Sequence, residues 1–377
     1  MRWWRRRTAV PGEPPADDLL ATEEALRTSI ADILVVHDRQ IRGGAIIFRG
    51  TLTVDPARAC TLMLQRFRPH GYTPFVRTGS AGVVVVQAWP VVDPVERPRV
   101  ALSAVLFALT CMSTLLAGAM HAGVVDFTVR PTWLLAGVPF AATLIGILGV
   151  HEFGHYFTAR HYRAAVSLPY FIPAPPPLFL FGTLGAIIRM RSAVRDRNAL
   201  FDIAAAGPLA GFVLALPATI LGLTWSTLQP APAGEYLRVG DSAVTMLLTW
   251  LTMGTVPAGM IVYTHPIADA GWVGLFVTAL NLFPVGQLDG GRIAYALFGR
   301  RHRVVGFAVF GATLVLGVVT MAMNWFVWAA LIFFLIGFAH GAPLDDVTPL
   351  SPARRLAGWA CLALFVLLIP PVPLSFG

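Results

Sequence analysis

The chain of 377 residues contains no lysine, only three cysteines and few charged residues of either sign. Charged residues make up 13% of it, whereas a soluble globular protein carries roughly 25%. The deficit is concentrated after residue 100, where Glu152 and Glu235 are the only glutamates. Several runs of about 17–25 apolar residues follow one another in this part, which is the length that a helix needs to cross a bilayer. The composition therefore excludes an ordinary soluble protein and predicts a polytopic membrane protein.

The cysteines are too few and too scattered for two common kinds of site. Cys60, Cys111 and Cys361 form no CxxC pair and no other paired spacing. The sequence therefore predicts neither a disulfide framework nor a zinc site built from thiolates.

Arginine alone supplies the net charge of +8. After residue 100 the arginines cluster at the ends of apolar runs rather than on one solvated face, so no nucleic-acid partner is predicted. Positive residues collect on the cytoplasmic side of membrane proteins. A cytoplasmic N-terminus places the arginine-rich loops at 160–199, 289–303 and 341–354 in the cytoplasm and leaves Arg130 and Arg238 outside. We expect a multi-pass protein of the cell (plasma or inner) membrane with a cytoplasmic N-terminus.

Two segments precede the apolar runs. Residues 1–16 are basic and rich in proline, and we expect them to be disordered. Residues 17–99 predict a small α/β cytoplasmic domain, because a strand in GGAIIFRGTLTV, a helix in DPARACTLMLQRF and two strands around RTGSAG follow in order. This order suggests a ferredoxin-like sandwich. The segment contains no catalytic constellation, so we expect a regulatory or assembly domain.

Residues 100–377 predict an α-helical transmembrane bundle of about 6–8 membrane segments with a catalytic core at 133–303. Residues 243–263 are apolar and could form a span, a re-entrant segment or a helix at the outer face. The expected spans are 101–124, 132–158, 200–225, 269–288, 304–322, 324–340 and 355–373.

The apolar residues 133–150 run directly into HEFGH, which contains His151, Glu152 and His155. On a helix this spacing places the two imidazoles one turn of about 5.4 Å apart on one face, where both can bind one zinc ion. The glutamate then lies beside the metal, where it can take a proton from the attacking water. The alternative is a structural pair of core histidines. That alternative does not explain why a glutamate lies at membrane depth. A charged side chain at the bilayer centre costs roughly 2.5–3.5 kcal/mol or more.

A catalytic zinc site needs three protein ligands, and Asp289 in NLFPVGQLDGGR is the candidate for the third. It lies at the cytoplasmic end of its expected span, as HEFGH does. The alternative is a helix cap before a Gly-Gly turn. A separate glycine pair, Gly207 and Gly211 in GPLAG, has the spacing of small residues that let two helices pack closely.

HEFGH in one predicted span and NLFPVGQLDGG in a later one resemble the paired signatures of the site-2 protease family of intramembrane zinc metalloproteases. The resemblance includes FGTLGA, LFDIAAAGPLAGF and HPIADAGWVGL, but no PDZ-like domain stands between the two motifs. The family pattern implies zinc (Zn2+) held by His151, His155 and Asp289, with Glu152 as the general base. It also implies that Asn281 orients the scissile carbonyl or its oxyanion, a role that suits an amide donor; helix capping or an interhelical hydrogen bond is the alternative.

The loop PYFIPAPPPLFLFGTLGAIIRMRS predicts a substrate-binding strand. Its prolines exclude a helix in the first half, and the second half reads as extended chain that contains Gly182, Thr183 and Gly185. An exposed strand edge can hold a substrate in the extended form by β-addition. A connector that skims the membrane is the alternative.

The sequence therefore predicts an intramembrane zinc endopeptidase that performs regulated proteolysis of a membrane-spanning protein near the cytoplasmic leaflet. The lipid bilayer and a transmembrane protein substrate are the expected partners. One alternative is a metal or proton transporter, since intramembrane His, Glu and Asp also form ion pathways. Transporters commonly contain repeated halves, and neither motif has a second copy. The other alternative is a zinc-bound scaffold without catalytic activity.

Overall fold

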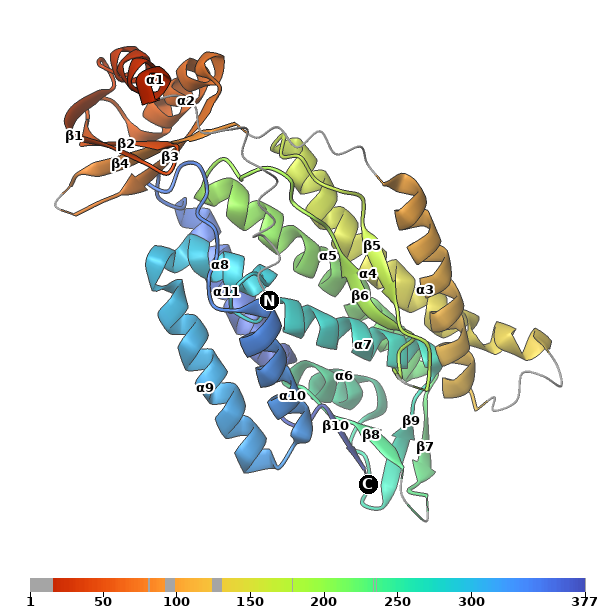
Figure 1. The fold of residues 1–377 in the computed structure, drawn as a ribbon. Coiled ribbons are helices and arrows are strands. Elements are labelled where there is room, and N and C mark those ends of the chain that lie inside the picture. The colour runs from red at the N-terminus through yellow and green to blue at the C-terminus, as the bar shows by residue number, and fades with distance from the viewer. Residues whose placement is uncertain are drawn as a thin grey trace. The chain divides into compact units, whose positions relative to one another are not determined.

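The computed structural model describes residues 16–80, 82–91, 99–123, 131–177, 179–232, 234 and 236–376 (Figure 1). The segment expected to be disordered, 1–16, lies outside these residues apart from Ala16. The chain divides into two compact units. We call them the α/β unit (Met1–Glu96, Ala193–Leu200 and Gly341–Ser351) and the membrane unit (Arg97–Ser192, Phe201–His340 and Pro352–Gly377).

The α/β unit contains a four-stranded antiparallel sheet in the order β1-β2-β4-β3. The fully buried Phe48, Met63 and Phe67 lie in its core. Asp55 caps α2 by accepting hydrogen bonds from the backbone N–H groups of the first turn. The elements are α1 (Ala16–Ser29), β1 (Leu34–Arg42), β2 (Ala45–Leu52), α2 (Pro56–Phe67), β3 (Tyr72–Thr78) and β4 (Val84–Pro90). The strand–helix–strand–strand order read from the sequence is present as β2-α2-β3-β4, whereas α1 and β1 were not foreseen.

Two short segments from later in the chain, 344–346 and 194–196, extend this sheet beyond β3. Val76 in β3 donates its N–H to the Leu344 carbonyl at 2.7 Å and accepts from the Asp346 N–H at 2.9 Å. The segment 344–346 in turn pairs with the second segment, because the Asp345 N–H donates to the Arg195 carbonyl at 2.8 Å. The edge of β3 is thereby covered rather than left open for pairing with another chain.

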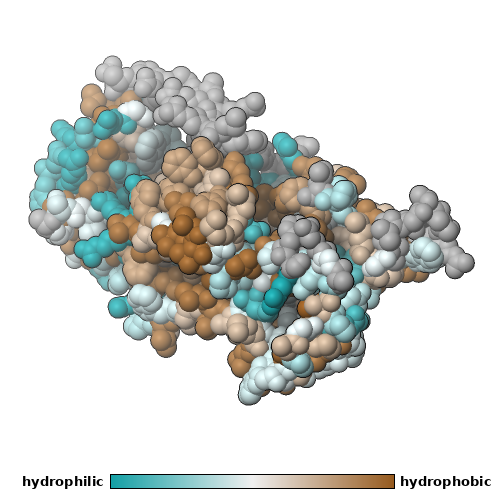
Figure 2. Space-filling view, turned by 90° about the horizontal axis from the view of Figure 1, so that it is seen from below, coloured by the Kyte–Doolittle hydropathy of each residue, from teal (hydrophilic) through white to brown (hydrophobic). Residues whose placement is uncertain are grey.

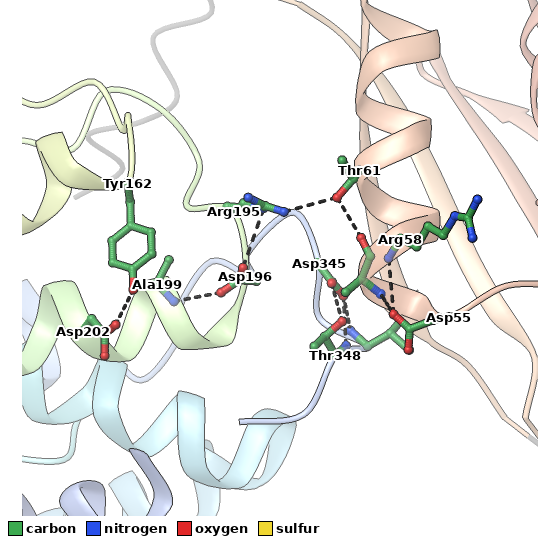
Figure 3. Close-up of polar contacts among 12 residues, drawn as sticks. Asp55, Arg58, Thr61, Tyr162, Arg195, Asp196, Ala199, Asp202, Asp345 and Thr348 are labelled. Carbon is green, nitrogen blue, oxygen red and sulfur yellow. Dashed lines mark hydrogen bonds and ion pairs between the residues drawn. The ribbon is translucent and has the colours of Figure 1, made fainter. Parts of the chain in front are cut away.

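Side chains fix these two segments within the α/β unit (Figure 3). The buried Asp345 carboxylate accepts from the Thr348 hydroxyl at 2.5 Å and from the Thr348 N–H at 3.0 Å. Arg195 donates to the Thr61 hydroxyl in α2 at 3.2 Å, and Arg197 donates to the buried Asp346 at 2.8 Å. The unit therefore consists of more than the contiguous segment that the sequence predicted.

The membrane unit is helical. Within the described residues, four helical segments are long and apolar enough to cross a membrane: Val100–His121, Thr132–His161, Arg197–Thr224 and Asp289–Thr320. Its helices are α3 (Val100–His121), η2 (Pro131–Gly137), α4 (Val138–His161), α5 (Arg197–Thr224), α6 (Ala243–Met253), α7 (Pro266–Asn281), α8 (Asp289–Phe298), η3 (Gly299–Arg301), α9 (His302–Thr320), α10 (Met323–Leu331), η4 (Ile332–Ile336) and α11 (Pro352–Leu368).

The helices of the membrane unit pack through apolar side chains and also expose many large apolar ones. Leu144 and Leu148 of α4 pack against α7 near Ala270 and Val273, and Ala215 of α5 packs with Leu275 of α7. Large apolar side chains remain exposed on several helices, including Phe157, Val319, Leu335 and Leu356. Figure 2 shows such apolar side chains gathered on one face of the molecule. Soluble monomers rarely expose so much apolar surface, so this surface is that of a membrane protein.

One expected span differs from the structure, and the structure decides one segment that the sequence left open. The helix α7 has 16 residues and ends at Asn281, so Asp289 does not end the expected span 269–288. It begins the separate helix α8, at the start of the candidate span Asp289–Thr320. Residues 243–263 form the 11-residue helix α6 and the strand β9 (Met260–Tyr263), which pairs with β7 (Thr227–Pro230). At 1.5 Å per residue, α6 is too short to cross a hydrocarbon core of about 30 Å.

Candidate metal centre

The helix α4 carries the HEFGH motif in its C-terminal half, where the helix bundle buries it. His151, Glu152 and His155 are only 3%, 5% and 3% exposed. The two histidines are one turn apart, and their Nε2 atoms lie 3.2 Å from each other. The helical placement expected from the spacing is therefore the observed one.

Asp289 reaches the histidines from the first residue of α8. Its Oδ2 atom lies 3.0 Å from His155 Nε2 and 3.7 Å from His151 Nε2. The first turn of α8 lies very close to the end of α7, because a Cβ atom on Gly290, the second residue of α8, would lie 1.9 Å from the Leu282 carbonyl oxygen. Only glycine fits there, so the Gly-Gly pair of LDGG brings the aspartate into the bundle.

The three side chains fit a metal ion. Bonds of about 2.0–2.1 Å in a tetrahedral site put ligand atoms about 3.3 Å apart, and the observed separations of 3.0, 3.2 and 3.7 Å bracket that value. His155 Nδ1 lies 2.6 Å from the Ile203 carbonyl oxygen, which can only accept a hydrogen bond. Nδ1 therefore carries the proton, and in the neutral ring Nε2 presents its lone pair.

A carboxylate oxygen and an imidazole lone pair that face each other in a buried site need a cation between them. Among the residues that the structure describes, His151, His155 and Asp289 are the one group of His, Cys, Asp or Glu side chains whose ligand atoms converge in this way, all within 4.8 Å of one another. The arrangement is therefore a candidate metal centre.

Glu152 and Asn281 lie beside this centre rather than in it. Glu152 Oε1 is 3.9 Å from His151 Nε2, so its carboxylate is near the ligand atoms without belonging to the converging set. Asn281, the last residue of α7, places its amide nitrogen 3.4 Å from the same His151 atom. The structure thus brings together the five residues that the sequence singled out for zinc chemistry.

Arg292 was not foreseen in the sequence. Its Nη1 atom lies 3.7 Å from Asp289 Oδ1, the carboxylate oxygen on the far side from His155. The spacing of three residues along α8 was the available signal, because residues i and i+3 of a helix are neighbours. The guanidinium offsets part of the buried negative charge.

The expected substrate strand is one half of a hairpin. β6 (Thr183–Ile187) pairs antiparallel with β5 (Tyr170–Pro173) in a two-stranded sheet, so no other described strand pairs with its second edge. Gly182 packs against α3, where Ser113 donates to its carbonyl at 2.6 Å. The buried Thr183 donates to the Ile172 carbonyl, and Gly185 needs its glycine because φ is +95°. These three residues therefore shape the hairpin, while Leu184 and Ile187 expose their side chains.

A bundle of apolar helices that buries an HExxH pair against a distant aspartate defines the class of intramembrane metallopeptidases. Comparison with known proteins agrees, since residues 139–324 match the model of the family described as Peptidase family M50. The chain therefore carries a domain of this family, the site-2 proteases, as the sequence motifs had indicated.

The chain is similar to curated proteins of plants, among them the following two. "Probable zinc metalloprotease EGY1, chloroplastic" of Arabidopsis thaliana is 32% identical over 252 residues, which cover 63% of this chain and 43% of that protein. "Probable zinc metalloprotease EGY2, chloroplastic" of Oryza sativa subsp. indica is 33% identical over 250 residues, covering 64% and 44%. The chain thus spans less than half the length of these relatives. No solved structure matches.

Proposed function

We propose that the chain is an intramembrane zinc endopeptidase that cleaves a membrane-spanning protein substrate near the cytoplasmic leaflet. One observation carries the proposal: His151, His155 and Asp289 converge inside a bundle of apolar helices, with the Glu152 carboxylate beside them. The names of the plant relatives as probable zinc metalloproteases support the choice of metal. Burial of the site among membrane helices supports a substrate that itself spans the membrane.

The ligands would be His151 Nε2, His155 Nε2 and one carboxylate oxygen of Asp289. When bound, zinc supplies a Lewis acid that polarises the scissile carbonyl. The hydrogen bond from His155 Nδ1 to the Ile203 carbonyl holds that ring in the tautomer whose Nε2 is free to bind. Arg292 Nη1 lies 3.7 Å from the other carboxylate oxygen of Asp289, and this attraction favours the orientation in which the first oxygen faces the histidines.

Glu152 is the general base of the proposed reaction. Its carboxylate takes a proton from the attacking water and then gives it to the leaving amine, which is the two-way transfer expected of one group in amide hydrolysis. Asn281 donates its amide N–H to the carbonyl oxygen as negative charge develops there. Both side chains lie within 4 Å of His151 Nε2, at 3.9 and 3.4 Å, so they reach the same reacting centre.

The second edge of β6 is the proposed place for the substrate strand. A peptide bond in a helix is hydrogen-bonded along the helix, so the substrate must unwind before it can be cleaved. The backbone groups of an unpaired strand edge can hold the unwound segment, with the exposed Leu184 and Ile187 beside it. Gly182 and Thr183 support this edge from within the hairpin, and Gly185 supplies its turn in direction.

A reconstitution experiment tests the proposed function. Proteoliposomes would contain the full chain and a single-span protein whose membrane segment includes helix-breaking glycine and proline. We expect cleavage within that segment, loss of cleavage after zinc is removed by a chelator, and recovery when zinc is added back. A Leu184→Asp variant should cleave more slowly with its zinc content unchanged. Cleavage that persists without zinc refutes the proposal, and zinc flux into the liposomes without any cleavage favours a transporter.

We further propose about 6–8 membrane segments, with the N-terminus on the cytoplasmic side of the cell (plasma or inner) membrane. The four long candidate spans together with three shorter helical segments, α7, α10 with η4, and α11, would make seven. The orientation rests on the arginines that cluster in two stretches, 160–197 and 292–303. The second stretch, expected to be a loop, consists of α8, η3 and the first residues of α9.

Cysteine labelling tests this orientation with two matched variants, Ala193→Cys and Ala258→Cys, each at an exposed alanine outside the helices. A membrane-impermeant maleimide added to intact cells should label Ala258→Cys and leave Ala193→Cys unlabelled until the cells are permeabilised. The native Cys60 should stay silent, because burial raises the pKa of its thiol to about 12; Cys111 is replaced by alanine in both variants. Labelling of Ala193→Cys in intact cells would reverse the proposed topology.

A further inference from the structure

We propose that Gly207 and Gly211 of α5 are positioning residues of the metal centre, because they let both histidine rings lie against the α5 backbone with their ligand nitrogens turned toward Asp289. This inference rests on the proposed zinc-dependent function. Ile203, Gly207 and Gly211 are four residues apart and therefore lie on one face of α5. The same periodicity places His151 and His155 on one face of α4.

Gly207 makes the closest approach. A Cβ atom at this position would lie 2.1 Å from Nε2, 2.4 Å from Cδ2 and 2.6 Å from Cε1 of His155. No real Cβ atom comes that close, and Nε2 is the same nitrogen that lies 3.0 Å from Asp289. Any side chain at position 207 would therefore turn the His155 ring away from its metal-binding orientation.

Gly211 makes a looser contact with the other histidine. A Cβ atom there would lie 3.2 Å from Nδ1 and 3.3 Å from Cβ of His151, which a shift of a few tenths of an ångström would relieve. The expected effects are therefore graded, with a large one at Gly207 and a smaller one at Gly211.

The adjoining hydrogen bond shows that this face orients the rings and does more than pack against them. One turn before Gly207, the Ile203 carbonyl accepts from His155 Nδ1 at 2.6 Å. A carbonyl fixes the tautomer and the angle of the ring, while the glycine leaves the ring the space to reach that carbonyl. Groups that orient metal ligands in this way typically change metal affinity by about 10–100-fold when they are altered.

The same helix provides a steric control. A Cβ atom on Gly222 would lie 2.1 Å from the backbone nitrogen of Ala268 in α7, as close as the contact at Gly207 but directed at backbone instead of a histidine. A Gly222→Ala change therefore disturbs helix packing to a similar degree without touching the metal centre. A change at Gly311 of α9, which has no atom within 4 Å of its Cβ position, disturbs neither.

The experiment compares Gly207→Ala, Gly211→Ala, Gly222→Ala and Gly311→Ala in the purified full chain. Zinc affinity is measured by competition with a chromophoric chelator and expressed per folded molecule, and Co2+ is added separately to record the absorption spectrum of the site. We expect Gly207→Ala to lose affinity by about 100-fold or more and Gly211→Ala by about 10-fold. Gly211→Ala should also shift the Co2+ spectrum, whereas folded Gly222→Ala and Gly311→Ala should match the wild type.

Wild-type zinc affinity and an unshifted Co2+ spectrum in Gly211→Ala would overturn the proposal even if Gly207→Ala fails to fold. Equal loss of zinc in Gly222→Ala would also overturn it, since the effect would then be general packing. Failure of the proposed function is distinguishable, because the wild type would then bind zinc and cleave no substrate while the graded glycine effects on affinity remain.

Discussion

Replacing Glu152 by glutamine should slow peptide-bond cleavage by about 10²–10⁴-fold, the usual contribution of a general acid–base group, and leave zinc bound. Glutamine keeps the size and hydrogen-bonding capacity of the side chain but cannot accept a proton at neutral pH. The buried carboxylate lies 3.9 Å from His151 Nε2 and outside the converging ligand set, so the metal should not depend on it. Cleavage rate and zinc content of the same purified variant check this result.

Asp269→Asn is a suitable control for Glu152→Gln. Asp269 is a partly buried carboxylate in the first turn of α7, where it accepts a hydrogen bond from Thr264. Its neutralisation should leave most of the cleavage activity, because it does not adjoin the metal centre. A Glu152→Gln variant that cleaves at the wild-type rate would exclude Glu152 as the base and would favour a structural or transport role for the motif.

Replacing Asp289 by alanine should remove zinc as well as cleavage. The side chain contributes the oxygen that faces both histidines, at 3.0 and 3.7 Å, and a catalytic zinc site needs three protein ligands. We therefore expect a loss of zinc affinity larger than the about 10–100-fold typical of outer groups. His151→Ala and His155→Ala should behave in the same way, as measured by competition with a chelator.

Arg292→Gln provides the graded comparison for Asp289→Ala. Arg292 contacts only the second oxygen of Asp289, at 3.7 Å, so its loss should weaken zinc binding by about 10–100-fold without abolishing it. If Asp289→Ala binds zinc as tightly as the wild type, the aspartate is a helix-terminal residue and another group completes the site.

The convergence of His151, His155 and Asp289 could be predicted because these residues follow local rules. The four-residue spacing of HEFGH fixes the relation of its two histidines on any helix, and the need for a third ligand pointed to Asp289. The place of Asp289 in the fold was predicted less well. A run of apolar residues up to 288 suggested one continuous span, but α7 ends at Asn281 and, after a turn, a new helix begins at Asp289. A hydropathy pattern does not register such a turn.

The contacts of α5 show more clearly what a sequence pattern does not predict. The spacing of Gly207 and Gly211 predicted close helix packing, and both glycines do lie against α4. That their partners are the two histidine rings depends on the rotation of α5 about its axis, which no local pattern encodes. The extension of the sheet beyond β3 is similar: Val76 pairs with residues 344–346, and backbone pairing over so long a separation leaves no signal in side-chain periodicity.

The measurement that tests the central claim most directly is the zinc content of Glu152→Gln and Asp289→Ala beside their cleavage rates, with all values taken from the same preparations as the wild type. The claim is that three side chains hold one zinc ion and a fourth moves the proton. It predicts about one zinc per chain in the wild type and in Glu152→Gln, little zinc in Asp289→Ala, and cleavage at the full rate by the wild type alone. Loss of zinc from Glu152→Gln together with Asp289→Ala, or cleavage by either variant at the wild-type rate, would contradict it.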